Sequence, residues 1–99
     1  MKLSNKCFSG TSFHGTVIVA KPSVLFEKVG IPQYNHNDGE DKTNFDWVCE
    51  TSEGEVFTIY DWKEYRSIQM NEDIEFHIGG YSRNTTEKAV NELKQLISG

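Results

Sequence analysis

The sequence predicts an α+β domain with a mostly antiparallel sheet of four strands and two helices on one face of that sheet. Four segments rich in β-branched and aromatic residues are separated by turn signals, and two further segments have the pattern of helices. Their order along the chain is β-α-β-β-β-α. The last helix carries one clearly apolar stripe, which is able to cover one face of the sheet.

The first strand is expected at residues 14–20, where β-branched side chains dominate. A short helix follows, because Pro22 is favoured at a first helical position and Gly30 is placed to end the helix. Pro32 prevents its continuation. The Asn, Asp, Gly and charged residues from 33 to 43 predict a mobile loop.

Residues 45–51 and 56–62 form the second and third predicted strands, joined by a hairpin turn in which Gly54 takes a left-handed conformation. Residues 74–78 are the fourth strand. The final helix is expected from about residue 85 to residue 97. Its apolar stripe consists of Ala89, Val90, Leu93, Leu96 and Ile97.

The composition fits a single domain over residues 1–99, with residues 1–12 as an N-terminal segment that could be mobile. Hydrophobic residues make up 36% of the chain and aromatic residues 12%, which leaves little apolar area to spare and favours oligomerisation. The net charge of −5 argues against nonspecific binding to nucleic acid or to an anionic membrane. A local cluster of donors could still bind a small phosphorylated ligand.

The two cysteines, Cys7 and Cys49, lie in unlike contexts and form no Cys-x-x-Cys pair. The start of the chain has no apolar run of signal-peptide length, and no later run approaches the length of a membrane span. We therefore expect a cytosolic protein with reduced thiols.

The faces of the predicted sheet differ. In the fourth strand Ile74, Phe76 and Ile78 point to one face and His77 to the other. The face away from the helices is expected to carry Trp47, Thr58, Tyr60, Trp62 and His77. Such an aromatic surface is too apolar to leave in water, so it is expected to form a subunit interface, a ligand site, or both.

Residues 76–88 are the most informative segment, since Gly79 and Gly80 interrupt the predicted strand just before a helix start. Glycines allow positive φ and close approach of a ligand, and a helix start carries partial positive charge. The nearby donors are Ser82, Arg83, Asn84, Thr85 and Thr86. Together these features suit a phosphate. The alternative is an ordinary helix start, with Asn84 as N-cap and Glu87 completing a capping box.

No catalytic set is convincing. His14, His36 and His77 fall in three different elements, and a general base needs a positioned partner. A nucleophilic pair of Cys49 and His77 is conceivable, but a buried strand cysteine is far more often inert. The acidic loop around Asp38 has no calcium-loop spacing and is better interpreted as a solvated loop. We expect a protein that is not an enzyme and that holds no metal or cofactor.

The binding chemistry is more promising. Tyr60, Trp62 and Trp47 offer flat faces for stacking of bases, each worth about 1–3 kcal/mol. The neighbouring cations are Lys42, Lys63 and Arg66. Aromatic faces beside cations and a glycine-rich helix start suit a nucleotide, with the base on a ring and the phosphate on the donors. The predicted ligand-binding residues are Trp47, Tyr60, Trp62, Lys63, His77, Gly79, Gly80, Ser82, Arg83 and Asn84.

The runs Thr-Ile-Tyr-Asp-Trp-Lys at 58–63 and His-Ile-Gly-Gly at 77–80, with supporting runs at 13–15, 26–32 and 45–48, are similar to a large family of small phage proteins. Over about residues 13–90 the chain resembles the family that includes anti-CBASS sponges. The resemblance implies a homotetramer that sequesters a cyclic dinucleotide such as 3′,3′-cGAMP in the host cytoplasm without hydrolysing it.

Hypotheses from different functional classes stay open. The first is a phage immune-evasion protein that withholds a cyclic nucleotide second messenger and so blocks activation of a CBASS effector. The second is an acidic adaptor or inhibitor that binds a host protein through the aromatic sheet face. An enzyme acting on nucleotides is the third. None of these involves DNA, RNA or a membrane as partner.

Overall fold

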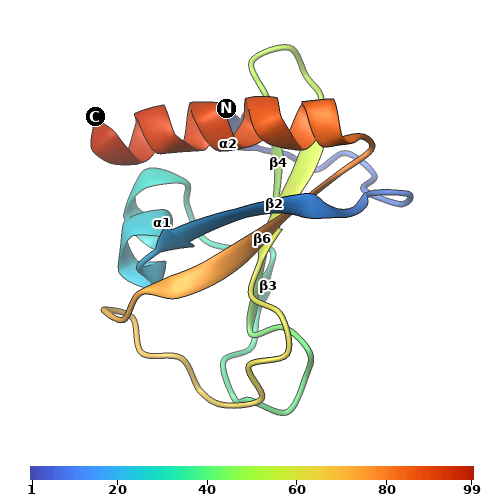
Figure 1. Ribbon diagram of the computed structural model, residues 1–99. Helices are drawn as coiled ribbons and strands as arrows, with labels where there is room; N and C mark the ends of the chain where they lie inside the picture. The colour runs from blue at the N-terminus through green and yellow to red at the C-terminus, as the bar shows by residue number, and fades with distance from the viewer.

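The computed structural model describes all 99 residues and confirms an α+β fold, with two helices and an antiparallel sheet (Figure 1). The elements in chain order are β1 (Lys2–Leu3), β2 (Ser12–Ala20), α1 (Pro22–Lys28), β3 (Tyr34–Asn35), β4 (Phe45–Glu50), β5 (Val56–Tyr60), β6 (Ile74–Gly80) and α2 (Arg83–Ser98). The strand order is β1-β4-β5-β6-β2, and β3 pairs with β4 beside β1. Every pair is antiparallel.

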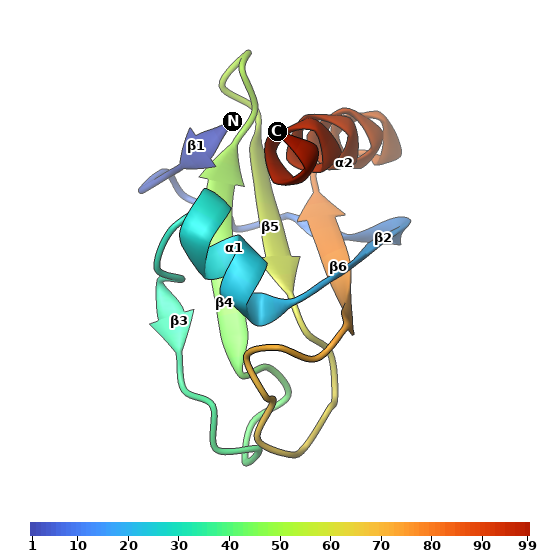
Figure 2. The same ribbon diagram turned by 90° about the vertical axis from the view of Figure 1, so that its left-hand side faces the viewer.

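The sheet has six strands instead of the expected four, because two short strands pair with the outer edge of β4 (Figure 2). Lys2 and Leu3 pair with one end of that edge, and Tyr34 and Asn35 with the other. Two-residue strands have no periodic pattern in the sequence. They form because the backbone N–H and C=O groups of the β4 edge need hydrogen-bond partners. The expected N-terminal segment and the expected 33–43 loop each contain one of them.

The element ends follow local capping rules. Gly30 ends the first helix as expected, with φ of +131° and its N–H bonded to the Leu25 carbonyl at 3.1 Å. The last helix begins two residues earlier than expected. Ser82, and not Asn84, is its N-cap, and its hydroxyl oxygen accepts the Thr85 N–H at 3.2 Å. Trp62, expected within a strand, lies in the loop that follows β5.

Both helices contribute to one core on the same face of the sheet (Figure 2). From the helices this core takes Leu25, Ala89, Val90 and Leu93, and from the strands it takes Trp47, Ile59, Phe76 and Ile78, among others. The alternation predicted for the fourth strand is confirmed, because Ile74, Phe76 and Ile78 are all buried in this core.

The placement of Trp47 on the open face was wrong. Its side chain is fully buried in the core, its Nε1 donates to the Gly30 carbonyl at 2.8 Å, and its ring packs edge-on against Phe26 and Phe76. The register explains this, since Trp47 lies directly opposite Ile59 and cross-strand partners share a face. Alternation in the sequence agrees with this placement, since Phe45, Trp47 and Cys49 alternate with the charged Asp46 and Glu50, but the prediction did not use it.

The expected break at Gly79 and Gly80 was also wrong. Both glycines belong to β6, neither has positive φ, and β5 and β2 pair with them on the two sides. A Cβ at Gly79 would lie 2.5 Å from Oγ1 of Thr58, and one at Gly80 would lie 2.9 Å from Cγ2 of Thr86. The glycines therefore allow close packing on the two faces of the sheet.

An irregularity in β2 shapes the open face. Phe13 pairs with Gly79, but the next aligned pair is Val17 with His77. Between these two pairs β2 therefore advances by four residues and β6 by two. Gly15 lies inside this bulge with φ of +90°. The bulge places the Phe13 ring over the His77 ring, with centroids 4.1 Å apart.

Asp61, which follows β5, joins the two loops at the end of the sheet. Its fully buried carboxylate accepts the backbone N–H groups of Asn44 and Phe45, both at 2.9 Å. The Asn44 side chain in turn donates to the Arg66 carbonyl and accepts the Gly39 N–H. Burial raises the pKa of Asp61, and the hydrogen bonds from Phe45 and Asn44 oppose that rise.

Replacing Asp61 with alanine should lower the free energy of unfolding by roughly 2–4 kcal/mol, because two buried backbone N–H groups would lose their acceptor. Urea denaturation of the purified variant measures this loss. Asp73→Ala is the matched control, since Asp73 is exposed and pairs only with Lys21, and it should change stability by less than about 0.5 kcal/mol. Equal effects of the two substitutions would contradict a structural role for Asp61.

Candidate functional site

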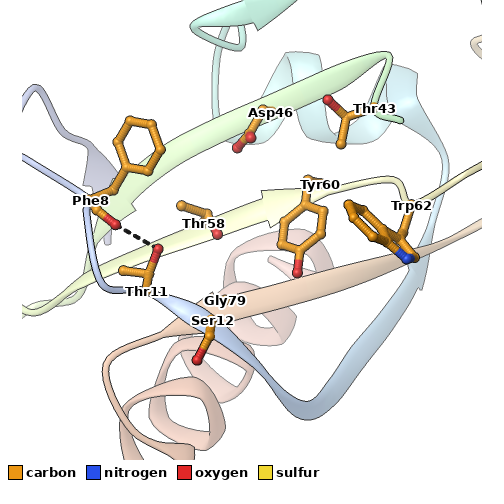
Figure 3. A pocket seen from close by; sticks show the side chains of 9 residues that line it. All are labelled: Phe8, Thr11, Ser12, Thr43, Asp46, Thr58, Tyr60, Trp62 and Gly79. Carbon is orange, nitrogen blue, oxygen red and sulfur yellow. Dashed lines mark hydrogen bonds between the residues drawn. The ribbon is translucent and has the colours of Figure 1, made fainter. Parts of the chain in front are cut away.

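The face of the sheet opposite the helices has a pocket with a volume of about 200 Å³ (Figure 3). It lies where the N-terminal segment, the start of β2 and the loop before β4 meet the central strands. Its lining residues are Phe8, Thr11, Ser12, Thr43, Asp46, Thr58, Tyr60, Trp62 and Gly79. The site therefore exists only after segments far apart in the sequence have been brought together.

Four rings form an aromatic cluster on this face, which we call the His77 cluster: Phe13, Tyr60, Trp62 and His77. Phe13 stacks on His77 with an interplanar angle of 17°. Tyr60 meets His77 edge-on at 5.5 Å, and Trp62 stacks at 6.5 Å. Burial lowers the pKa of His77, with a smaller opposing effect of Glu75, so this ring is neutral near pH 7.

Two lysines flank the exposed ring of Trp62. The Nζ atoms of Lys42 and Lys63 lie 5.8 Å and 5.5 Å from the ring centroid. The Lys63 N–H donates to the Lys42 carbonyl at 2.7 Å, which links the two loops. Lys63 also has φ of 55°, an uncommon conformation for a residue other than glycine. The fold therefore gathers two cations beside a pocket-lining aromatic ring.

Asp46 is the acidic group of the pocket. Its Oδ1 is buried and has no hydrogen-bond partner, which is unusual for a carboxylate in a folded protein. Burial raises its pKa to about 7, and the negative charge of Asp61 contributes to the rise. The sequence prediction missed Asp46, although a carboxylate between the two aromatic residues Phe45 and Trp47 could have been noticed.

The predicted ligand-binding residues divide into separate groups. Tyr60, Trp62, Lys63, His77 and Gly79 come together on the open face. Trp47 lies in the core and Gly80 lies beneath α2. Ser82, Arg83 and Asn84 form the exposed start of α2, where the Ser82 hydroxyl caps the helix and Arg83 pairs with Glu87 at 3.2 Å.

The two glycines do not contribute to a phosphate cradle as predicted. The backbone of Gly79 and Gly80 is paired to strands on both sides, so it is not free to meet an anion. Besides Asp46, the sequence prediction missed Phe8, Thr11, Ser12, Thr43 and Phe13. Nothing in their local sequence marks them, because the bulge and the N-terminal segment bring them to this face.

The geometry rules out the Cys49–His77 pair. Cys49 faces the helical core and His77 faces the open side of the sheet, and burial raises the pKa of Cys49 to about 12. His36 pairs with Asp38 at 2.8 Å on an exposed loop. The structure holds no group of three or more His, Cys, Asp or Glu side chains arranged to hold a metal ion. None of its helices has the length and apolar content needed to cross a membrane.

Asp46 should make stability depend on pH in a defined direction. The ordinary pKa of 3.8 rises to about 7 in the folded protein, so between these values the folded state keeps a proton that the unfolded chain has lost. The contribution of this group to the free energy of unfolding therefore falls as pH rises through the window and is constant above it.

Asp46→Asn should remove this dependence, because a neutral amide has no charge to desolvate. The variant should be more stable than the wild type by about 1–3 kcal/mol at pH 8. The difference should shrink towards acidic pH. Urea denaturation of both proteins from about pH 5 to about pH 8 measures it, and the comparison cancels the titration of groups common to both proteins. Parallel stability curves would contradict the elevated pKa.

No family model, curated protein or solved structure matches the chain. The resemblance to small phage proteins therefore stays a prediction from sequence. The chemistry of the open-face pocket is the basis for assigning a function.

Proposed function

We propose that this protein binds a cyclic nucleotide second messenger of the 3′,3′-cGAMP type on the open face of its sheet and withholds it without hydrolysis. The observation that carries this proposal is the His77 cluster beside two lysines and a pocket. Aromatic faces stack on nucleobases, and ammonium groups pair with phosphates, so the two parts of a nucleotide each find a complementary surface.

The aromatic part supports stacking because its rings are reachable. The Trp62 side chain is 40% exposed and Phe13 is 43% exposed, while Tyr60 lines the pocket with its ring 6.0 Å from that of Trp62. Rings fixed by one another lose little freedom when a base stacks on them. A base can therefore use an aromatic surface that is already in place.

The phosphates belong at Lys42 and Lys63 in this proposal, and not at the glycines and helix start favoured by the sequence. The protein carries a net charge of −5, so an anionic ligand needs a local positive site. Lys42 and Lys63 provide one beside the stacking surface. Retention of an intact cyclic nucleotide would keep a CBASS effector inactive in the host cytoplasm, which is the phage role that the resemblance implies.

The same face supports self-association. Strand β2 is an edge strand, and its Phe13, Val17 and Val19 side chains are exposed on the open face. We propose that this surface contributes to a homo-oligomer, a tetramer by resemblance, which closes its edges through symmetry. Binding of a host protein to the same apolar residues is the second candidate function.

Tyr60→Ala should weaken binding of 3′,3′-cGAMP by about 1–3 kcal/mol, because one stacking surface is lost. Isothermal titration calorimetry with 3′,3′-cGAMP and related cyclic nucleotides measures the change. Tyr65→Ala is the matched control, since Tyr65 is exposed and lies outside the pocket lining, and it should leave affinity unchanged.

Chromatography of material released by denaturing the complex should recover the cyclic nucleotide intact. A linear product would instead indicate an enzyme. Absence of binding across the whole set of cyclic nucleotides would remove the proposed function and favour the host-protein inhibitor.

Val19→Lys should shift the protein towards the monomer mass of 11.3 kDa, because a charge would be placed on the exposed edge strand. Light scattering at micromolar concentration measures the mass. Gln95→Lys is the control, since it adds the same charge to the exposed side of α2. A wild-type protein that is already monomeric would contradict the oligomer.

A further inference from the structure

We propose that the open-face pocket accepts a guanine base, with the N1–H and the N2 amino group of guanine donating to the Asp46 carboxylate. This inference rests on the proposed function and adds the identity of the base. It follows from the one buried side-chain atom that the fold leaves without a partner, together with the distribution of charge around the pocket.

Asp46 needs a donor that the protein does not provide. Its Oδ1 is buried beside the pocket and accepts no hydrogen bond, while nearby Asp61 is saturated with N–H donors from Asn44 and Phe45. A buried acceptor without a partner costs free energy, which a ligand carrying a suitable donor recovers. In this proposal the missing partner is a hydrogen-bond donor of the ligand, which reaches Oδ1 from the pocket that Asp46 lines when the carboxylate turns towards it (Figure 3).

The negative and positive groups around the pocket lie at different places. A carboxylate lies among its lining residues, whereas the two ammonium groups lie at Trp62. A simple cation would meet Asp46 but would be repelled by Lys42 and Lys63. A ligand with a donor edge at one end and negative charge at the other satisfies both sites, and guanine nucleotides have this arrangement.

Adenine fits less well. Its exocyclic amine can donate to one carboxylate oxygen, but its N1 presents a lone pair to the other oxygen. Guanine presents two adjacent donors, which match two oxygens of one carboxylate. The volume of about 200 Å³ is below the roughly 300–1,000 Å³ of pockets for drug-sized ligands, so the proposal places only one base in the pocket. The rest of a cyclic dinucleotide would then lie over the His77 cluster.

The test is calorimetric titration with three probes, 3′,3′-cyclic di-GMP, cyclic di-IMP and cyclic di-AMP, near pH 8, where Asp46 is ionised. Inosine keeps the N1–H and lacks the N2 amine. The wild type should bind the guanine ligand about tenfold to a hundredfold more tightly than the adenine ligand, with the inosine ligand between them.

Asp46→Asn should abolish or reverse this order, because an amide can donate to adenine N1 while accepting from its amine. Glu75→Gln is the matched control. It removes the same charge from an exposed position on the open face outside the pocket, and the guanine preference should persist. A structural role of Asp46 alone would change affinity for all three ligands together and leave their order intact.

The outcomes separate the two proposals. Equal binding of all three probes, or an unchanged order in Asp46→Asn, would overturn guanine recognition while leaving nucleotide sequestration in place. If none of the three probes bound, both guanine recognition and nucleotide sequestration would be overturned. If Asp46→Asn does not fold, the order of the three ligands on the wild type alone decides the inference, since only the base edge differs among them.

Discussion

The buried carboxylate of Asp61 is the interaction on which both the end of the sheet and the pocket depend. It accepts the N–H groups at the start of β4 from its position directly after β5, so it fixes where the two strands meet. Through Asn44 it also secures the Arg66 loop. Trp62 and Lys63 follow Asp61 immediately in the chain. The aromatic ring and the cation of the site are therefore positioned by a buried group that does not itself line the pocket.

The sheet separates two kinds of environment, and β6 makes the separation possible. Gly80 lets Thr86 of α2 approach one face, and Gly79 lets Thr58 approach on the other. On the helical side no buried side-chain nitrogen or oxygen lacks a hydrogen-bond partner, as the Trp47 bond to the Gly30 carbonyl illustrates. On the open side, exposed rings, flanking lysines and an unpartnered carboxyl oxygen remain. This asymmetry is the physical basis for proposing that binding takes place on the open face.

Several unfavourable features concentrate at this site. Lys63 has a left-handed backbone conformation, Oδ1 of the half-buried Asp46 has no donor, and Phe13 and Trp62 keep much of their apolar surface in water. Each costs stability on its own. The proposed ligand would add a donor at Asp46 and cover the exposed parts of the Phe13 and Trp62 rings.

The sequence by itself determined the α+β class, the four main strands, both helices and the inward face of residues 74–78, since period and capping signals are local. It also identified Tyr60, Trp62, Lys63 and His77, which the structure brings together. Only the tertiary structure decided the rest. Strand pairing absorbed Gly79 and Gly80 into β6. The short strands β1 and β3 form because they pair with the otherwise free edge of β4. The burial that isolates Asp46 comes from segments distant in the chain, and no local pattern encodes such contacts.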